Sequence, residues 1–422
     1  MKRLMYLFIA AAFVSGYTAT QAAALTVGLP VKDVRFLIDV SSVDVAVKAG
    51  HAVVINKTDA QTKGGKWAIG QAKKLGVALS GKTVVYDMTA VEATQDIAGV
   101  EFPVWAFVPS NKVQGNKVVG YKNPHGPVPG PTIIANEGDL VRVILRNKSL
   151  NNHTIHIHGP TVISYDHDGT QNVAQVAVKP DQEFTYEFVA SPTGTHLYHC
   201  HVNANEHMDM GLYGGIIIHK KGDEKVDQDL LVMLDEWDSK FSKEEGFAPT
   251  TATDKQSVEV GHPRNIARMN LFTINGNAWT DEYPNVIVGT QGQKIRVRFI
   301  NMGNWPHNMH FHGHTLTQVT QDGRPTPGRP QSDSVVVVSG ERKDYIFTAD
   351  QDGRWVWHCH VVPHATNDGV YHGGLLMAFV YLHPKKDGKG PYGGVLDGSG
   401  IDLDAYPLGK PVKIGEKPFD AL

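Results

Sequence analysis

The 422-residue chain contains only two cysteines, and each of them lies between two histidines. Cys200 occurs in GTHLYHCHVNANEH and Cys359 in GRWVWHCHVVPH. In an oxidising compartment two cysteines could simply form a disulfide. The chain also has 21 histidines, most of which fall in four short segments. Histidines clustered around a thiol indicate metal ligands, so a metal site competes with the disulfide as an interpretation.

The spacing of these residues matters because successive side chains of a strand point to opposite faces of the sheet. His199 and His201 would share one face, while the thiol of Cys200 would point to the other face. The same spacing recurs around the second cysteine. One strand could therefore serve two metal sites that are joined by a few covalent bonds.

A thiolate with two imidazoles is the ligand set of a trigonal copper site, usually with a weak fourth ligand. Zinc also accepts Cys and His, but zinc sites prefer compact motifs such as C-x2–4-C, and the chain has no such cysteine pair. Two thiol sets, each of one cysteine and two histidines, are candidates: His153, Cys200 and His207 in one half of the chain and His307, Cys359 and His364 in the other. Eight further histidines form four pairs that suit a cluster of several coppers: His156/His158, His199/His201, His310/His312 and His358/His360.

The elements that carry these residues are duplicated. Segment 137–159 (EGDLVRVILRNKSLNNHTIHIHG) corresponds to segment 291–313 (QGQKIRVRFINMGNWPHNMHFHG). Short runs rich in Val, Ile, Thr and Phe end at Gly, Pro or Asn, which is typical of an all-β sandwich. The sequence predicts two tandem β-sandwich domains, at residues 81–222 and 266–384. The linker between them, residues 223–265, begins with a strand in DLLVMLDEW. Residues 25–80 form an N-terminal extension of unassigned role, and residues 385–422 form a C-terminal tail.

Residues 1–24 have the composition of a signal peptide. Lys2 and Arg3 precede an apolar run, and small residues end the segment. We therefore expect a periplasmic or secreted protein. No later segment approaches the roughly 20 apolar residues of a membrane helix, so no membrane span is predicted. The net charge of −3 argues against a nucleic-acid partner.

The order H-x-H-G, H-C-H, H-x-x-H-x-H-G and H-C-H-x3-H, over about residues 82–384, resembles the multicopper oxidase family in its two-domain, laccase-like form. This resemblance implies cupredoxin-like Greek-key domains. It also implies a type 1 copper that takes single electrons from a reductant, and a trinuclear type 2/type 3 copper cluster that reduces dioxygen to water. The eight paired histidines would hold the cluster. The electron donor could be a small molecule, a metal ion or a redox protein.

By the same resemblance, each thiol set would hold a type 1 copper, although some two-domain oxidases keep the thiol in only one domain. Leu212 lies five residues after the last ligand of the first set, at the position of the axial group, with Met210 as a nearby alternative. A non-ligating leucine would leave a three-coordinate copper of higher potential. In the second domain ATNDGVYH interrupts the spacing, so His372 with Met377 is an alternative to His364.

Asp168, in YDHDGT, matches an acidic residue that would deliver protons to reduced oxygen species in similar enzymes. An aspartate before glycine is also common in turns, and that alternative stays open.

A two-domain chain with half of the cluster ligands on each domain can complete the cluster between subunits. We therefore expect a homotrimer, by resemblance to other two-domain oxidases. Two other functions remain open: a two-domain copper nitrite reductase, and a non-catalytic periplasmic copper or electron-transfer protein.

Overall fold

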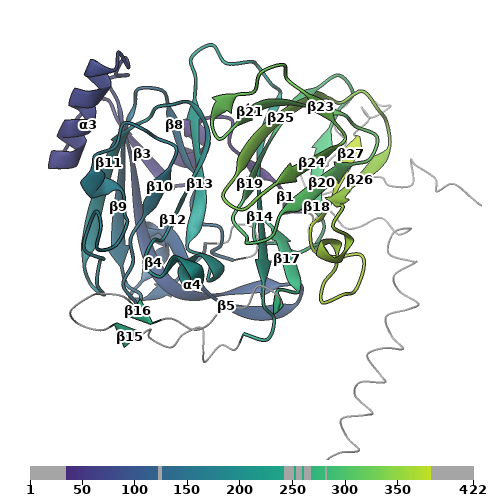
Figure 1. Cartoon of the computed structure of the whole chain (residues 1–422), viewed down its shortest axis with the longest axis horizontal. Coiled ribbons are helices and arrows are strands. Elements are labelled where there is room, and N and C mark those ends of the chain that lie inside the picture. Colours follow the sequence, from purple (N-terminus) through teal and green to yellow (C-terminus); the bar gives the residue numbers. More distant parts are fainter. Residues whose placement is uncertain are drawn as a thin grey trace, which may run out of the picture.

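The computed structural model describes residues 35–121, 126–241, 251–252, 259–260, 268–280 and 283–381. The expected signal peptide (1–24) and C-terminal tail (385–422) lie outside the described residues. Strands dominate the described part and form two sandwiches side by side (Figure 1). The prediction of an all-β chain is confirmed. No helix in these described segments is long and apolar enough to cross a membrane.

The first sandwich consists of a four-stranded and a five-stranded sheet. The four-stranded order is β10 (His156–His158), β12 (Gly194–His199), β13 (Tyr213–His219) and β8 (Ile133–Asn136). The five-stranded sheet contains β11 (Glu183–Val189), β9 (Leu140–Asn147), β4 (Thr83–Ile97) and β3 (Ala52–Ile55), with β5 (Val100–Pro109) also paired to β4. One apolar core lies between the sheets and includes Cys200.

The second sandwich repeats this arrangement with more strands. Its six-stranded sheet has the order β1 (Arg35–Phe36), β18 (Asn285–Gly289), β27 (Leu376–Tyr381), β26 (Arg354–Cys359), β20 (His307–Phe311) and β24 (Ser334–Val337). The larger sheet contains β17 (Leu271–Ile274), β14 (Gln228–Trp237), β19 (Lys294–Asn301), β25 (Arg342–Thr348), β21 (Leu316–Gln321) and β22 (Arg324–Pro325), with β2 (Ile38–Asp39) on β14 and β23 (Gln331–Ser332) on β21. Cys359 belongs to the apolar core of this sandwich.

The strand expected at the start of the linker is β14. It pairs in parallel with β19, and Val232 and Leu234 are fully buried in the second core. These residues therefore pack with the second domain, although the sequence placed them in the segment between the domains.

The remaining described elements are short. They are helices α2 (Val43–Lys48), α3 (Lys63–Lys74) and α4 (Ala204–Asp209), the 3-10 turns Ser110–Lys112, Tyr165–His167 and Val362–Ala365, and strands β6 (Val113–Gln114), β7 (Lys117–Val118), β15 (Thr251–Ala252) and β16 (Glu259–Val260).

The N-terminal extension contacts both sandwiches. Strands β1 and β2 extend the two sheets of the second domain, while β3 joins the first. Helix α3 lies beside β11 at the outer edge of the first domain (Figure 1). Thr62 caps α3 by accepting the backbone N–H of Gly65 at 2.8 Å, and its hydroxyl donates to the buried carboxylate of Glu187 at 2.7 Å.

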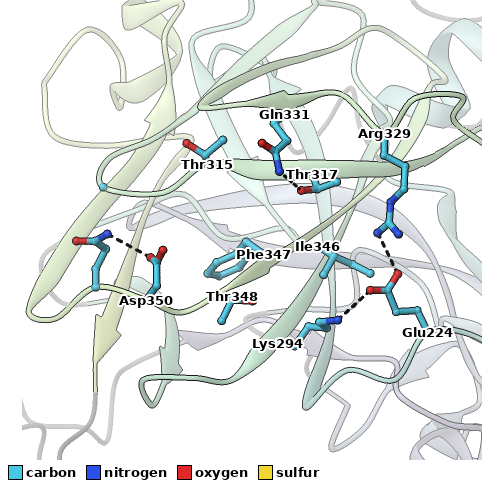
Figure 2. A pocket seen from close by; sticks show the side chains of 12 residues that line it. Glu224, Lys294, Thr315, Thr317, Arg329, Gln331, Ile346, Phe347, Thr348 and Asp350 are labelled. Carbon is cyan, nitrogen blue, oxygen red and sulfur yellow. Dashed lines mark hydrogen bonds and ion pairs between the residues drawn. The ribbon is translucent and has the colours of Figure 1, made fainter.

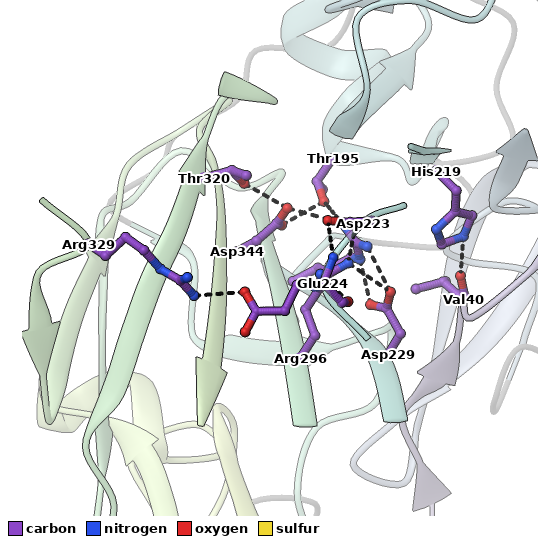
Figure 3. Close-up of polar contacts among 11 residues, drawn as sticks. Val40, Thr195, His219, Asp223, Glu224, Asp229, Arg296, Thr320, Arg329 and Asp344 are labelled. Carbon is purple, nitrogen blue, oxygen red and sulfur yellow. Dashed lines mark hydrogen bonds and ion pairs between the residues drawn. The ribbon is translucent and has the colours of Figure 1, made fainter. Parts of the chain in front are cut away.

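A buried polar network joins the two domains (Figure 3). Arg298 donates to Asp229 at 2.6 Å and to Asp344 at 3.0 Å, and Asp344 also accepts the hydroxyl of Thr195 from the first domain at 2.6 Å. Burial alone would lower the pKa of Arg298, but the two carboxylates outweigh it and raise this pKa. Every charge named here has a partner, and the hydroxyl of Thr195 ties β12 to β25 of the second domain.

Candidate metal centre

The first thiol set converges inside the first sandwich. The thiol of Cys200 lies 3.2 Å from Nδ1 of His207 and 3.7 Å from Nδ1 of His153, and these two nitrogens are 3.2 Å apart. All three residues are fully buried. The three predicted residues therefore come together at one point.

The second set converges in the same way. Nδ1 of His307 lies 3.0 Å from Nδ1 of His364, which lies 3.8 Å from the thiol of Cys359. The possible ligand atoms of all three residues lie within 4.8 Å of one another. His372, the alternative, is exposed, lies outside this group and places its ring against Tyr371.

A duplicated turn delivers the first histidine of each set. The side chain of Asn147 donates to the carbonyls of Asn151 and Val178, and accepts the N–H two residues on. Asn301 repeats all three bonds with Trp305, Val337 and the N–H of Gly303. Each asparagine thus shapes the loop that ends six residues later at His153 or His307.

These groups suit a metal that needs neutral imidazoles. Burial lowers the pKa of His153 well below its usual range and that of His364 to about 4, so each ring keeps a lone pair at neutral pH. Burial also raises the pKa of the Cys359 thiol to about 11, against smaller opposing effects of two backbone N–H groups. Lone pairs converging with a thiol fit a cation, which would favour the thiolate. A disulfide is not formed, since both cysteines are free.

The paired histidines of the first domain face away from the thiol. Nε2 of His158 lies 3.0 Å from Nε2 of His199, and these two with His156 can each offer an atom within 4.8 Å of the others. Nδ1 of His199 donates to the carbonyl of Cys200 at 2.8 Å. That bond leaves the lone pair on Nε2, the nitrogen that faces the neighbouring ring. His201 adds a fourth ring, 5.1 Å from His156 between centroids.

The second domain repeats this group of four histidines, and each such group is called a half-site below. Nε2 atoms of His312 and His358 are 3.1 Å apart, and Nδ1 of His358 donates to the carbonyl of Cys359 at 3.0 Å. His310 and His360 complete the set, with ring centroids 5.6 Å apart. His312 and His360 are exposed, whereas His199 in the first domain is buried. Within the described ranges, the ring contacts of all eight histidines stay inside their own domain.

The expected alternation therefore holds at the end of β12, where His199 is its last residue and Cys200 follows. His199 points into the half-site while the thiol of Cys200 joins His153 and His207. One peptide unit separates a ligand of one group from a ligand of the other.

The axial positions can be compared through the backbone. Leu212 is fully buried, accepts the N–H of Cys200 at 2.9 Å and donates to the carbonyl of His207 at 3.1 Å. In the second domain Leu375 makes the same two bonds, with Cys359 and His364, each at 2.9 Å. The segment from His364 to Leu375 is six residues longer than the segment from His207 to Leu212. The position equivalent to Leu212 is therefore Leu375, which sequence reasoning missed, and not Gly369, as linear spacing would suggest.

The other predicted axial candidates, Met377 and Met210, do not occupy the position that Leu212 and Leu375 share. Met377 pairs with Trp357 on the neighbouring strand, two residues beyond Leu375. Met210 is buried at the end of α4, and its carbonyl accepts the N–H of Trp105 at 2.8 Å. The backbone therefore puts a leucine at the matched position in both domains.

Asp168 lies beside the first half-site. Its carbonyl accepts Nδ1 of His156 at 2.6 Å, and a carboxylate oxygen lies 3.4 Å from the same nitrogen. Asp333 holds His310 similarly, through its carbonyl at 2.9 Å and a carboxylate oxygen at 4.0 Å. Sequence reasoning missed Asp333, which follows its histidine at a different spacing.

A polar cavity of about 360 Å3 lies elsewhere on the second domain (Figure 2). It is lined by Thr315, Thr317 and Thr348 and by the ion pair of Lys294 and Glu224 at 3.0 Å. No histidine or cysteine lines this cavity, so it offers none of the ligand types found in the groups above.

Comparison with known proteins agrees with this geometry. Two family profiles, each described as multicopper oxidase, match residues 110–223 and 247–374. The multicopper oxidase mgLAC is 31% identical, with a TM-score of 0.59 over 70% of this chain and 86% of that one. A blue copper oxidase from Nitrosomonas europaea is also 31% identical, with a TM-score of 0.59 over 70% of this chain and 85% of that one.

Among curated proteins, laccase-4 from Thanatephorus cucumeris is 29% identical over 62% of this chain and 52% of its own length. The chain spans about half or less of the curated relatives it matches. The fold is thus of the cupredoxin type found in these oxidases. The chain belongs to the multicopper oxidase family, and copper is the metal for which its histidine and cysteine groups are suited.

Proposed function

We propose that the protein is a copper-dependent oxidase that takes single electrons from a reductant and reduces dioxygen to water. Copper would supply the one-electron chemistry, with type 1 sites at the thiol sets and a type 2/type 3 trinuclear cluster held by the eight paired histidines. The observation that carries the proposal is the direct covalent link between the two kinds of group at Cys200 and Cys359.

The two thiol sets would receive electrons. His153, Cys200 and His207 would hold one copper, and His307, Cys359 and His364 another. Burial excludes water from both sets. Leu212 and Leu375, which make matching backbone bonds to the two sets, offer no ligand atom, which would favour a high reduction potential of a copper held there.

The paired histidines would form the oxygen-reducing centre between two chains. Each domain carries four of them, and the half-site of the second domain is partly exposed at His312 and His360. If the first domain of one chain faces the second domain of the next, repeated contacts of this kind close into a ring. In a homotrimer, each of the three first-domain half-sites would face a second-domain half-site of another chain.

Asp168 would supply protons to the reduced oxygen. Its side chain is 41% exposed beside His156, so it can exchange protons with solvent while facing the half-site. Thr170 donates to the far carboxylate oxygen at 2.5 Å and orients it.

The electron donor and the location follow from more general features. The composition of residues 1–24 supports export to the periplasm or medium. Phenols, reduced metal ions and small redox proteins are all single-electron donors that suit such a site. A laccase and a copper resistance protein from Escherichia coli are among the relatives, and these names favour phenols and cuprous ion as the first donors to assay.

The test is a copper count with optical and electron paramagnetic resonance spectra, followed by oxygen uptake with a panel of donors. We expect two type 1 signals per chain and four electrons consumed for each dioxygen. The Cys200→Ser and Cys359→Ser variants should each lose one type 1 signal. Copper loading without oxygen uptake would contradict the oxidase, and nitrite turnover in its place would support the reductase alternative.

A further inference from the structure

The two thiol sets differ in the hydrogen-bond partner of Nε2 on their first histidine. Strands β4 and β9 pair in parallel with Ala90 opposite Asn147, and β14 and β19 pair in parallel with Leu234 opposite Asn301. Because the two asparagines are equivalent, the residues two positions beyond these partners are equivalent as well. Both are glutamates: Glu92 in the first domain and Glu236 in the second.

Glu236 reaches the histidine of its set. One carboxylate oxygen accepts the backbone N–H of Asn304 and, at 2.9 Å, that of Trp305. The other oxygen lies 3.2 Å from Nε2 of His307, and both side chains are fully buried. Nδ1 of the same ring faces His364, so the ring bridges the carboxylate and the set.

Glu92 is held away from its histidine. A single oxygen of its carboxylate accepts both the hydroxyl of Ser149 at 2.6 Å and the N–H of Leu150 at 2.7 Å. Nε2 of His153 is buried and makes no hydrogen bond within the described part of the chain. The two histidines therefore differ although their loops share the same asparagine bonds.

One residue accounts for the difference. Ser149 and Gly303 are equivalent, because each donates its N–H to the asparagine two residues before it at 2.9 Å. The hydroxyl of Ser149 donates a hydrogen bond to the carboxylate of Glu92. A side chain at Gly303 would instead collide with Glu236, since a Cβ there would overlap the oxygen that faces His307.

We propose that Glu236 is a positioning residue that gives the two mononuclear copper sites different reduction potentials. Gly303 has no side chain and so leaves room for Glu236 to reach His307. The inference rests on the proposed function, in that it takes both sets as type 1 sites. Glu236 accepts the Nε2 proton of His307, which fixes the tautomer whose Nδ1 lone pair faces the metal. A carboxylate on the far nitrogen makes the imidazole a stronger electron donor and stabilises the more highly charged cupric ion. The second-domain site therefore has the lower reduction potential, and the first-domain site, without this partner, has the higher.

The experiment uses full-length chains that keep one type 1 site each. Cys200→Ser leaves the second-domain site, and Cys359→Ser leaves the first. The potential of the remaining site is measured by optical redox titration of its thiolate band, with the electron paramagnetic spectrum as a second readout. We expect a lower potential in the Cys200→Ser chain than in the Cys359→Ser chain.

Variants then separate positioning from structure. In the Cys200→Ser chain, Glu236→Gln keeps the size of the side chain and should raise the potential, and Gly303→Ser should raise it in the same direction by displacing Glu236. In the Cys359→Ser chain the matched control, Glu92→Gln, should leave potential and spectrum unchanged. An unchanged potential in folded, blue Glu236→Gln protein would overturn the proposal.

Cobalt provides a readout that does not depend on turnover. Its thiolate band reports binding at the cysteine site alone, and Glu236→Gln should weaken this affinity by about 10–100-fold. If the Cys200→Ser chain gives no thiolate band with copper or cobalt, the second set is not a metal site and the inference is wrong. Oxygen uptake by the wild-type protein would then show that the oxidase proposal survives with the first-domain site alone.

Discussion

At the scale of single residues, the backbone decides which imidazole nitrogen is offered to a metal. In each half-site the histidine before the cysteine donates Nδ1 to a carbonyl, so Nε2 faces its neighbour. In the thiol sets the rings are turned round, and Nδ1 atoms converge on the thiol. The same residue type thus offers Nε2 in the paired-histidine groups and Nδ1 in the thiol sets.

Asp168 provides a prediction at this scale. Asp168→Asn removes the titratable carboxylate beside His156 and should reduce the rate of dioxygen reduction by about 100-fold. Anaerobic reduction of the type 1 sites by donor should stay unchanged, because it involves no proton transfer at the half-site.

The control is Asp166→Asn, two residues away, whose carboxylate accepts the hydroxyl of Ser164. If both variants lost the same fraction of the rate of dioxygen reduction, that rate would depend on the structure of the turn and not on the carboxylate of Asp168.

The ligand types could be read from the sequence because motif spacing is local. The converging histidines and cysteines all came from short motifs. Leu375 could not be found this way, since an inserted loop separates it from His364, and only the backbone bonds reveal its place. Glu236 lies on another strand from His307, and its position depends on sheet register, which linear spacing does not encode.

At the scale of elements, the N-terminal extension connects the domains rather than merely preceding them. Its strands enter sheets of both sandwiches, and α3 is fastened to β11. The all-β pattern was readable from strand-like runs in the sequence. The role of residues 35–80 was not, because their apolar residues follow no strong period and their partners lie far away in the chain.

The anchor at Glu187 gives a prediction for this element. Glu187 is fully buried and accepts bonds from Arg142, Thr62 and Gln61. Burial raises the pKa of this carboxyl, but these hydrogen bonds outweigh it and lower the pKa overall. Glu187→Gln should leave Arg142 buried without its counter-ion and lower the free energy of unfolding by about 3–5 kcal/mol, measured by denaturant titration.

A matched control lies on the same strand. Glu183 pairs with Arg146, but both side chains are substantially exposed. Glu183→Gln should cost at most about 1 kcal/mol. Similar losses in the two variants would show that the buried pair does not anchor the extension.

At the scale of the whole molecule, acid should destabilise the metal-free protein. Burial lowers the pKa of His158 to about 4 and that of His199 to about 3, with smaller contributions from neighbouring charged groups. Between these values and the ordinary 6.5, the unfolded chain binds protons that the folded chain does not. The free energy of unfolding of the metal-free protein should therefore fall as the pH drops from about 6.5 towards about 4.

Thermal unfolding of metal-free protein across this range checks the prediction. Copper-loaded protein should unfold at a higher temperature at each pH, because copper binds the folded state. A stability that rises on acidification would mean that the rings are already protonated in the fold.

The arrangement of the half-sites predicts that neighbouring chains share the oxygen-reducing cluster. Each chain carries one group of four histidines on each of its two domains, and the Arg298 network joins these domains. His158→Ala damages the half-site of the first domain, and His312→Ala damages that of the second.

Co-expression of these two variants is the most direct test. Each variant alone should lack oxygen uptake, because every cluster in its assembly contains one damaged half. Mixed assemblies, isolated through different tags on the two chains, should regain uptake, since an intact first domain then meets an intact second domain. Copper-loaded mixed assemblies that remain inactive, or a wild-type monomer that reduces dioxygen at full rate, would contradict the shared cluster.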